Sequence, residues 1–406
     1  MLKKRFIIIG GGAAGIFGAL AAAKAHPEAE VIVLEKSPKL LAKVRISGGG
    51  RCNVTHHCFD PSLLAQNYPR GHSELLGPFS RFQPKDTVNW FHEHGVQLKT
   101  EADGRIFPTT DDSQTIIDCL LKSAEKLNIK IFTKTNVEKV EVVEKSLFKV
   151  FINTEDPLTC DRILLATGGG QSNSGFEIAQ SLGHTIVPPV PSLFTFNIKD
   201  TRLDDLQGIS FPTVKVEVLG TSLKSEGPLL ITHWGLSGPV ILKLSAWGAR
   251  ILHDLNYNFE LRINFLSNFS TEKLIVELKK IKEQLSLKQI IKNPLFDVTK
   301  RFWEKIAATA GIAEDLSWAH ISLTQMQNLA NELTQGKYIA YGKSTYKDEF
   351  VTCGGVSLKE INFKTMESRI CSGFFFAGEV LDIDGVTGGF NFQAAWTTSW
   401  IAGNSM

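Results

Sequence analysis

The chain has 406 residues, of which 43% are hydrophobic and 21% charged, and its formal net charge is +2. A chain of this length and composition can bury a core and is expected to form two or three domains. The near-neutral charge gives no reason to expect a nucleic acid or an anionic membrane as a partner. The six cysteines contain no C-x-x-C pair. Their spacing favours reduced thiols in a cytoplasmic protein over a disulfide framework or a metal site.

The N-terminus begins with basic residues and an apolar run, which superficially resembles a secretory signal. Three glycines at residues 10–12 interrupt the apolar run, so this segment is predicted to be part of the mature fold. No run of about 18 uninterrupted apolar residues occurs anywhere, and no membrane span is expected.

The first predicted elements form a strand, a glycine loop, a helix and a second strand. Residues 6–9 are apolar and mostly β-branched, which predicts a short buried strand. The pattern G-x-G-x-x-G follows at residues 10–15, and an alanine-rich helix is expected to about residue 25. A second strand over residues 31–34 ends at Glu35, 20 residues after Gly15. This spacing predicts a dinucleotide-binding βαβ unit.

Each part of this motif has a role in binding a dinucleotide. Gly10 permits the tight turn, Gly12 lets a pyrophosphate approach the backbone, and Gly15 lets the helix pack closely. The N-terminus of the helix offers N–H groups to the phosphates. Glu35 can accept hydrogen bonds from an adenosine ribose, and its charge disfavours a phosphate on that ribose.

A second glycine-rich loop spans residues 47–55, SGGGRCNVT. Three consecutive glycines cost conformational entropy, so they are expected where the backbone passes close to a ligand. Arg51 is a candidate contact for a phosphate or a flavin carbonyl, and Asn53 can donate or accept hydrogen bonds. Cys52 is interpreted as a packing residue more readily than as a reactive one.

Helices are predicted at residues 84–94 and 113–127, with a hairpin between them. A later strand, residues 162–166, runs directly into A-T-G-G-G at residues 166–170. Flavoproteins with two dinucleotide folds place such a turn where the chain passes near the cofactor. Thr167 and Gly168 are therefore candidate contacts.

From residue 188 onward, prolines and short alternating segments predict a β-rich domain. The sequence H-W-G-L-S-G-P at residues 233–239 precedes a predicted helix over residues 240–252. This loop is either a well-formed helix start or a polar turn aimed at a ligand. His233 is the candidate for proton transfer, because a histidine pKa lies near working pH. The lysine-rich residues 273–292 are interpreted as a solvated helix face and not as an RNA-binding patch.

The last residues again contain a short apolar strand followed by glycines and a helix, as in the first domain. A short strand is predicted at residues 374–377, and Gly388 and Gly389 precede a final helix over residues 392–401. These glycines leave the first N–H groups of the helix open to a ligand. Such a helix would stabilise negative charge on the N1–C2=O edge of a reduced flavin. Glu379 or Asp382 can bind a ribityl chain or cap the turn.

Taken together, these motifs resemble the BaiN/YhiN-like family of NAD(P)/FAD-dependent oxidoreductases, also known as the aminoacetone-oxidase family. The resemblance covers the whole chain. It is carried by residues 10–15, 47–55, 166–170, 232–239, 351–356, 365–369 and 373–396. It implies an α/β fold in which a discontinuous Rossmann-like FAD-binding domain (1–190 and 353–406) holds two insertions. These are a β-rich domain (191–268 and 336–352) and a small helical domain (269–335).

The resemblance also implies FAD as the tightly held cofactor. A reduced nicotinamide, NAD(P)H, is expected only as a transient electron donor, because the chain has no second nicotinamide-binding motif. The residues expected to contact FAD are Gly10, Gly12, Ala13, Ala14, Gly15, Glu35, Lys36, Ser47, Gly48, Gly49, Gly50, Arg51, Cys52, Asn53, Val137, Thr167, Gly168, Gly378, Glu379, Asp382, Gly388, Gly389, Phe390, Asn391 and Phe392.

The leading hypothesis is an FAD-dependent oxidoreductase that exchanges hydride between a reduced nicotinamide and a small organic substrate. Disulfide reduction is disfavoured by the lack of a C-x-x-C pair. The alternatives are a flavin-dependent RNA-modifying enzyme, against which the near-neutral charge argues, and a non-catalytic flavin-binding protein. The substrate and the oligomeric state are left open.

Overall fold

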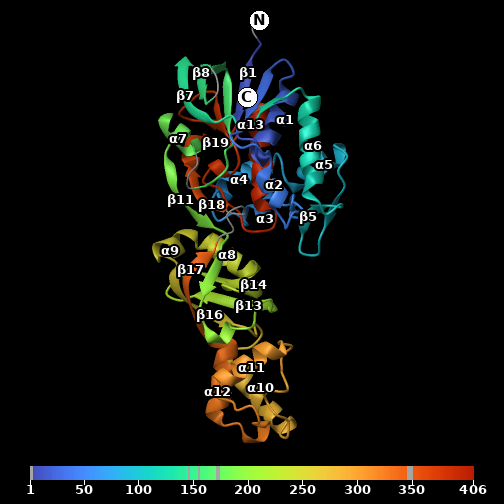
Figure 1. Cartoon of the computed structure of the whole chain (residues 1–406), viewed down its shortest axis with the longest axis vertical. Helices are drawn as coiled ribbons and strands as arrows, with labels where there is room; N and C mark the ends of the chain where they lie inside the picture. Colours follow the sequence, from blue (N-terminus) through green and yellow to red (C-terminus); the bar gives the residue numbers. More distant parts are fainter. Residues whose placement is uncertain (1–2, 145–146, 154–155, 171–173, 345–350) are drawn as a thin grey trace. The chain divides into compact units, whose positions relative to one another are not determined.

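The computed structural model describes residues 3–144, 147–153, 156–170, 174–344 and 351–406. The chain divides into two compact units (Figure 1). Unit 1 is Met1–Ser192 with Tyr346–Met406, and unit 2 is Leu193–Thr345. None of the helices that the structure describes has the length and apolar character needed to cross a membrane.

Unit 1 is built on a seven-stranded sheet in the order β19-β20-β21-β10-β1-β2-β6. The run from β21 to β6 is parallel, and β19 and β20 extend it in antiparallel fashion. The chain thus contributes to one sheet from both of its ends. The strands are β1 (Arg5–Ile9), β2 (Glu30–Leu34), β6 (Lys130–Phe132), β10 (Arg162–Leu165), β19 (Ile361–Asn362), β20 (Glu367–Ser368) and β21 (Phe374–Phe376).

Two helices from opposite ends of the sequence pack closely beside this sheet: α1 (Ala13–Ala25) and α13 (Phe390–Ser405) (Figure 1). A Cβ atom built on Gly403 would lie 2.5 Å from the carbonyl oxygen of Gly18. Only glycine therefore allows this approach. Trp396 of α13 is fully buried, and its indole N–H donates to the Val54 carbonyl over 2.9 Å. Helix α13 begins two residues earlier than the sequence predicted.

The remaining elements of unit 1 surround this centre. They form three further sheets, with the orders β3-β5-β4, β7-β8-β9 and β11-β18. The strands are β3 (Thr55–His56), β4 (Leu98–Thr100), β5 (Arg105–Pro108), β7 (Val137–Glu144), β8 (Leu147–Ile152), β9 (Leu158–Cys160), β11 (Ile186–Ser192) and β18 (Val351–Val356). The helices are α2 (Ala42–Ile46), α3 (Pro61–Ala65), α4 (His72–Phe79), α5 (Pro84–Glu93), α6 (Ser113–Lys126) and α7 (Ser174–Ser181).

Unit 2 contains a closed barrel in the order β12-β15-β14-β13-β16-β17. Its strands are β12 (Thr195–Ile198), β13 (Ser210–Val218), β14 (Lys224–Thr232), β15 (Gly235–Ser237), β16 (Asn258–Asn264) and β17 (Gly336–Ser344). Its helices are α8 (Pro239–Trp247), α9 (Ala249–Asp254), α10 (Thr271–Gln284), α11 (Lys300–Thr309) and α12 (Leu323–Gln335). Gly238 is the N-cap of α8, which begins at Pro239, one residue before the predicted start, and Gly248 divides the expected helix into α8 and α9.

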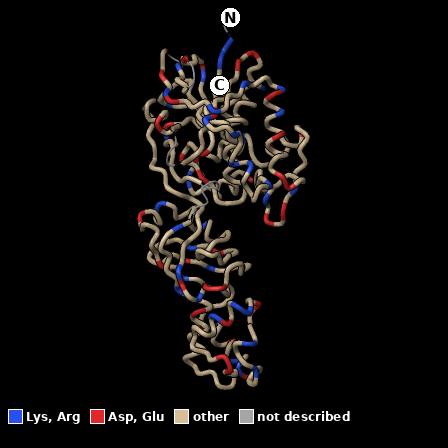
Figure 2. Tube along the Cα trace, in the orientation of Figure 1, with Lys and Arg blue, Asp and Glu red and all other residues tan. Residues whose placement is uncertain are grey.

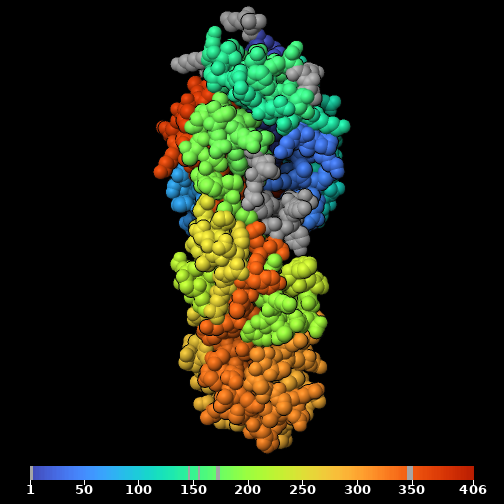
Figure 3. Space-filling view, turned by 60° about the vertical axis from the view of Figure 1, so that its left-hand side comes forward, coloured from blue at the N-terminus to red at the C-terminus, as the bar shows by residue number. Residues whose placement is uncertain are grey.

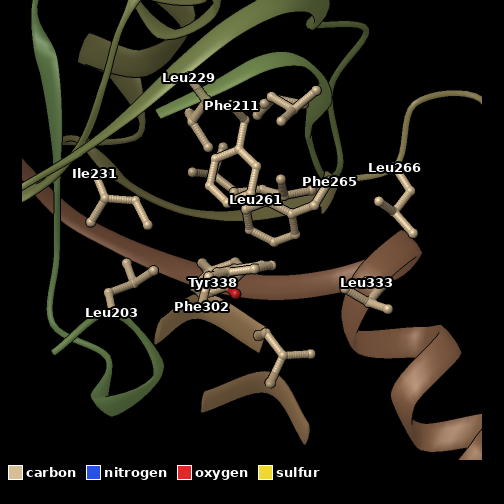
Figure 4. Packing of buried hydrophobic residues seen from close by; sticks show 14 of the residues in the cluster. Leu203, Phe211, Leu229, Ile231, Leu261, Phe265, Leu266, Phe302, Leu333 and Tyr338 are labelled. Carbon is tan, nitrogen blue, oxygen red and sulfur yellow. The ribbon is translucent and has the colours of Figure 1, made fainter. Parts of the chain in front are cut away.

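The barrel and the helices α10–α12 share one hydrophobic core (Figure 4). Phe302 of α11 packs against Phe211 of β13 and Phe265, which follows β16, with ring centroids 4.8 and 4.7 Å away. The sequence prediction of a Rossmann-like α/β fold with an inserted β-rich part is confirmed. The separation of residues 269–335 as a domain of their own stays a prediction, and part of its predicted neighbour, residues 345–350, lies outside the described chain.

We predict that Phe302→Ala lowers the free energy of unfolding of unit 2 by about 3–5 kcal/mol, because it removes a fully buried ring and leaves a cavity. Since the core is shared, the barrel and the helices should lose stability together in one transition, measured by urea unfolding. Leu287→Ala is the control, because Leu287 is 91% exposed. Selective melting of the helices alone would contradict a shared cooperative core.

Candidate functional site

The loop between β1 and α1 has the geometry of a phosphate-binding turn. Gly10 adopts a φ of +113°, and a Cβ there would lie 2.5 Å from the Ala166 carbonyl oxygen. A Cβ on Gly15 would lie only 1.8 Å from the Gly10 carbonyl oxygen. At Gly12, by contrast, a Cβ would meet nothing within 4 Å. Packing thus accounts for Gly10 and Gly15, and Gly12 leaves the space that a pyrophosphate needs.

The N-terminus of α1 is suited to bind an anion. Gly12 is its N-cap, no side chain caps it, and its first turn contains no acidic residue. Ala13 and Ala14 occupy the first turn, where N–H groups have no partner within the helix. A Cβ on Gly378 would lie 2.8 Å from the Cβ of Ala14. The C-terminal segment therefore lies directly against this end of the helix.

Glu35 holds the glycine loop in place through its carboxylate. One carboxylate oxygen accepts from the Gly11 N–H over 2.6 Å, and the other accepts from the Ser37 N–H over 2.7 Å. Each oxygen retains a further lone pair for a ribose hydroxyl. Lys36 is exposed beside it. The sequence did not predict the contact with Gly11.

Val137 starts β7 just after a segment that runs beside Glu35. The Glu35 N–H donates to the Phe132 carbonyl, and the Thr135 N–H donates to the Glu35 carbonyl, both over 2.9 Å. Val137 itself is buried. The structure thus brings Val137 and Glu35 to neighbouring segments, and a contact of Val137 with a cofactor stays a prediction.

The second glycine loop is also built for backbone exposure. Gly48, Gly49 and Gly50 adopt φ values of +59°, +70° and +87°, a conformation that disfavours other residues. A Cβ on Gly49 or Gly50 would meet nothing within 4 Å. Ser47 ends the preceding helix α2, and its carbonyl accepts from the Cys52 N–H over 2.9 Å. The Gly50 N–H donates to the Ile46 carbonyl over 3.1 Å, and the Gly50 carbonyl accepts from the Ser113 N–H over 2.8 Å. Gly48 and Gly49 are exposed, and theirs is the part of the loop backbone that is open to a ligand.

The two side chains that follow this loop are held by protein partners. Arg51 pairs with Glu101 over 2.6 Å and lies 4.0 Å from the ring centroid of Phe107. Cys52 is fully buried, and burial raises the pKa of its thiol to about 12. This supports packing as the role of the Cys52 side chain. Contacts of either residue with a cofactor stay predictions.

Asn53 connects this loop to the start of α13. In the amide orientation that satisfies both polar atoms, Asn53 donates to the Thr55 carbonyl over 3.0 Å and accepts from the Gly389 N–H over 2.9 Å. Gly389 is the N-cap of α13, with φ +92°, and a Cβ there would lie 2.6 Å from the Thr55 carbonyl oxygen. Residues far apart in the sequence thus meet at one helix start.

Other side chains fix the approach to α13. Asn391 holds Gly385 by accepting from its N–H over 2.8 Å and donating to its carbonyl over 3.0 Å. Phe390 stacks on His56 with ring centroids 4.7 Å apart, and burial lowers the pKa of His56. Phe392 stacks on Trp396. The Gly388 turn, with φ +127°, completes the segment.

Glu379 is held between two segments. One of its oxygens accepts from the Thr352 N–H over 2.8 Å, and the other lies 2.8 Å from the Lys43 ammonium.

Thr167, beside Gly10, has a buried hydroxyl with no hydrogen-bond partner among the described residues. Gly168 follows with φ +74°. This buried hydroxyl fits a site that binds a polar ligand.

The C-terminal loop contains an ion pair that the sequence analysis missed. Arg70 pairs with the buried carboxylate of Asp384, and the Ser192 hydroxyl donates to the same carboxylate over 2.6 Å. Burial raises the pKa of Asp384 to about 6. The nearby Asp382 N–H donates to the Val356 carbonyl over 3.1 Å. In the sequence, the local feature that points to this ion pair is the presence of two aspartates, Asp382 and Asp384, two residues apart.

His233 lies in unit 2, in the turn between β14 and β15, and is exposed. The other candidate residues lie in unit 1. The role of His233 in proton transfer therefore stays a prediction. Within the part of the chain that the structure describes, no group of three His, Cys, Asp or Glu side chains is placed to hold a metal ion.

The chain is similar to a known protein family and to several characterised proteins. The model of the HI0933-like protein Rossmann domain matches residues 4–405. A ribosomal RNA dihydrouridine synthase of Haemophilus influenzae is 32% identical over 408 residues, covering 97% of this chain and 96% of that protein. A 3-dehydro-bile acid delta(4,6)-reductase of Clostridium scindens is 27% identical over 409 residues, covering 99% and 98% of the two chains.

Among solved structures, a 3-ketosteroid delta1-dehydrogenase from Sterolibacterium denitrificans superposes with a TM-score of 0.52. The match covers 100% of this chain and 99% of that chain, with 11% sequence identity. At this identity the likeness concerns the fold alone.

The two glycines of the first loop give a paired prediction. Gly12→Ala should leave the unfolding midpoint almost unchanged, because its Cβ has space, yet the purified protein should carry less FAD. Gly15→Ala should lower the unfolding midpoint in the apoprotein as well, because its Cβ collides with the Gly10 carbonyl. Absorbance of bound flavin and thermal unfolding measure the two effects. Full FAD content in Gly12→Ala would argue against a pyrophosphate at this loop.

Proposed function

Because the chain belongs to the HI0933-like family of FAD-dependent oxidoreductases, we propose that it reduces a carbon–carbon double bond conjugated to a carbonyl group. The electrons would come from a reduced nicotinamide. The favoured substrate is a uridine base in ribosomal RNA.

The observation that carries this proposal is what the names of the two relatives share. Dihydrouridine is uridine with two hydrogen atoms added across the C5=C6 bond of uracil, which is conjugated to the C4 carbonyl. The name of the bile-acid enzyme also describes reduction of double bonds, in a substrate oxidised at position 3. The higher identity to the ribosomal RNA enzyme, 32% against 27%, favours uridine.

The net reaction balances two electrons and two hydrogens. A hydride would be added to the carbon β to the carbonyl and a proton to the α carbon, and the nicotinamide would be oxidised. FAD supplies the hydride when it is bound. The protein's task is to hold the cofactor, orient the unsaturated ring and deliver the proton.

Residues of unit 1 are suited to the first task. The N-terminus of α1 at Gly12 would bind the pyrophosphate, and Glu35 would bind the adenosine ribose. The N-terminus of α13 at Gly389 would stabilise negative charge on the pyrimidine part of the flavin. Asn53 and Asn391 would act by positioning that helix start.

From the net charge of the chain, no nucleic-acid partner was expected. A net charge of +2 argues against tight binding through many phosphates, but not against recognition of a single base. An RNA substrate, kept as an alternative from the sequence, therefore becomes the favoured one. A small unsaturated ketone is the second candidate, supported by the bile-acid relative.

The proposal predicts two measurable half-reactions. Under anaerobic conditions, NADH or NADPH should bleach the flavin absorbance of the purified holoprotein. Transcribed ribosomal RNA should then restore that absorbance, and mass spectrometry of digested RNA should find uridine heavier by two hydrogen atoms. A conjugated steroid ketone serves as the comparison acceptor.

The outcomes separate the candidates. Reoxidation by the steroid ketone and not by RNA would replace the favoured substrate while keeping the reaction. A flavin that neither nicotinamide reduces would contradict the nicotinamide-linked reaction. If the correctly folded protein were colourless and took up no FAD, the whole proposal would fail.

We predict that His233→Ala lowers turnover of the unsaturated acceptor by about 100-fold, the usual size of a general-acid contribution. Reduction of the flavin by the nicotinamide should be unchanged, because that half-reaction does not use the proton donor. His253→Ala is the matched control, since His253 is an exposed histidine of α9 in the same unit. Stopped-flow absorbance follows both half-reactions. Unchanged turnover in His233→Ala would remove His233 from this role.

A further inference from the structure

The barrel of unit 2 has a strip of surface that almost lacks side chains. Asn197 of β12 pairs with Gly235 of β15 on one side and with Gly342 of β17 on the other. Its neighbours Phe196 and Ile198 are buried in the barrel core. Because side chains alternate along a strand, Asn197 faces outward. Of these three residues in one row, only Asn197 projects a side chain beyond the backbone.

Two exposed aromatic side chains flank this strip. Trp234 immediately precedes Gly235 and is 65% exposed, and its carbonyl accepts from the Ile198 N–H over 2.9 Å. Tyr341 immediately precedes Gly342 and is 52% exposed. The two aromatics therefore stand on opposite sides of β12. Together, Trp234, Gly235, Asn197, Tyr341 and Gly342 define what we call the aromatic strip.

Backbone geometry fixes both flanks. The pairing register shifts between Asn197 and Ile198, so that Tyr341 is the extra residue of a β-bulge. At Gly235 the φ is +142°, and a Cβ would lie 2.3 Å from the Phe196 carbonyl oxygen. A larger residue cannot occupy this position without moving β12. The lack of a side chain at Gly235 in the aromatic strip is therefore required by the strand pairing.

The amide of Asn197 is the polar group of the aromatic strip. Its oxygen accepts from the Ser344 hydroxyl over 2.7 Å. Its nitrogen has no acceptor among the described residues, so its two N–H groups can donate to a ligand. Carbonyl oxygens on the edge of a pyrimidine base match such a donor.

The charged residues beside the strip come close to balancing one another. Lys199 follows β12 and is exposed. The adjacent Asp200 is neutralised, because both of its oxygens accept from Arg202, over 2.9 and 2.7 Å. Glu332 also pairs with Arg202, over 2.7 Å. Charges of both signs alternate along the trace of unit 2 in Figure 2. Lys199 and Arg202 together balance Asp200 and Glu332, so these four groups carry no net charge, and a phosphate would be held by short-range contact with the Lys199 ammonium.

We propose that the aromatic strip binds a base of single-stranded RNA, stacked on Trp234 or Tyr341 and hydrogen-bonded to Asn197. This inference rests on the proposed function, in which RNA is the substrate. In the space-filling view, the orange segment that contains β17 reaches the surface of the barrel (Figure 3). Bases of single-stranded RNA stack on exposed aromatic rings, and this needs little net charge.

The test uses the FAD-loaded full chain and a fluorescent oligouridine of about 12 nucleotides, within the length such surfaces cover. Fluorescence anisotropy should show that Trp234→Ala and Tyr341→Ala each weaken binding by about fivefold or more. Trp234→Phe should restore most of the affinity, because it keeps a stacking ring. Trp247→Ala is the matched control, since Trp247 is an exposed tryptophan at the end of α8.

A second readout tests the polar and charged parts. Asn197→Ala should reduce the preference for oligouridine over an abasic oligomer of the same length. Lys199→Ala should reduce the dependence of binding on salt by about one phosphate contact. Nicotinamide reduction of the flavin should be unchanged in all these variants.

Three results would overturn the inference. The first is wild-type protein that does not bind oligouridine. The second is equal affinity of Trp234→Ala and wild type for oligouridine. The third is a Trp234→Ala variant whose KM is raised for the steroid ketone and not for RNA. The proposed reaction is judged separately, by reoxidation of the reduced flavin. If a Trp234→Ala variant bound RNA with wild-type affinity and still reduced it, the proposed function would stand, and the aromatic strip would not be its RNA-binding site.

Discussion

The close approach of two glycine-bearing segments from opposite ends of the chain is the constraint on which unit 1 depends. Gly378 lies against Ala14 at the start of α1, and Gly389 lies against the Thr55 backbone at the start of α13. A side chain at either glycine would separate the segments. The same condition recurs where Gly403 meets Gly18 between the two helices. Because these positions lack a Cβ atom, the C-terminal segment can pack against the start of α1, and the start of α13 can pack against the Thr55 backbone.

Several side chains first expected to touch the cofactor have partners in the protein itself. Glu35 holds Gly11, Asn53 holds Gly389, and Asn391 holds Gly385. These hydrogen bonds fix the glycine loops, whose flexible backbone would otherwise cost conformational entropy on binding. Preorganised loops and direct cofactor contacts are compatible, because a carboxylate or amide oxygen has two lone pairs.

Unit 2 offers a different kind of surface. Its barrel has a continuous core shared with three helices, while its outer face carries exposed aromatic residues on both sides of Asn197. A protein of near-neutral charge gains little from long-range attraction to RNA. Stacking and short-range hydrogen bonds would give it a way to select a single base. This division would leave cofactor binding to unit 1 and base recognition to unit 2.

The sequence by itself determined the features that depend on local spacing. The βαβ unit with Glu35, the glycine turns and the helix start at Pro239 follow from residues close together in the chain. Tertiary structure decided the closed barrel, the pairing of Arg70 with Asp384 and the placement of Trp234 and Tyr341 around Asn197. The physical reason is that these contacts depend on strand order and register. Both are set by packing between segments separated along the chain, as where Asn197 pairs with Gly235 and with Gly342.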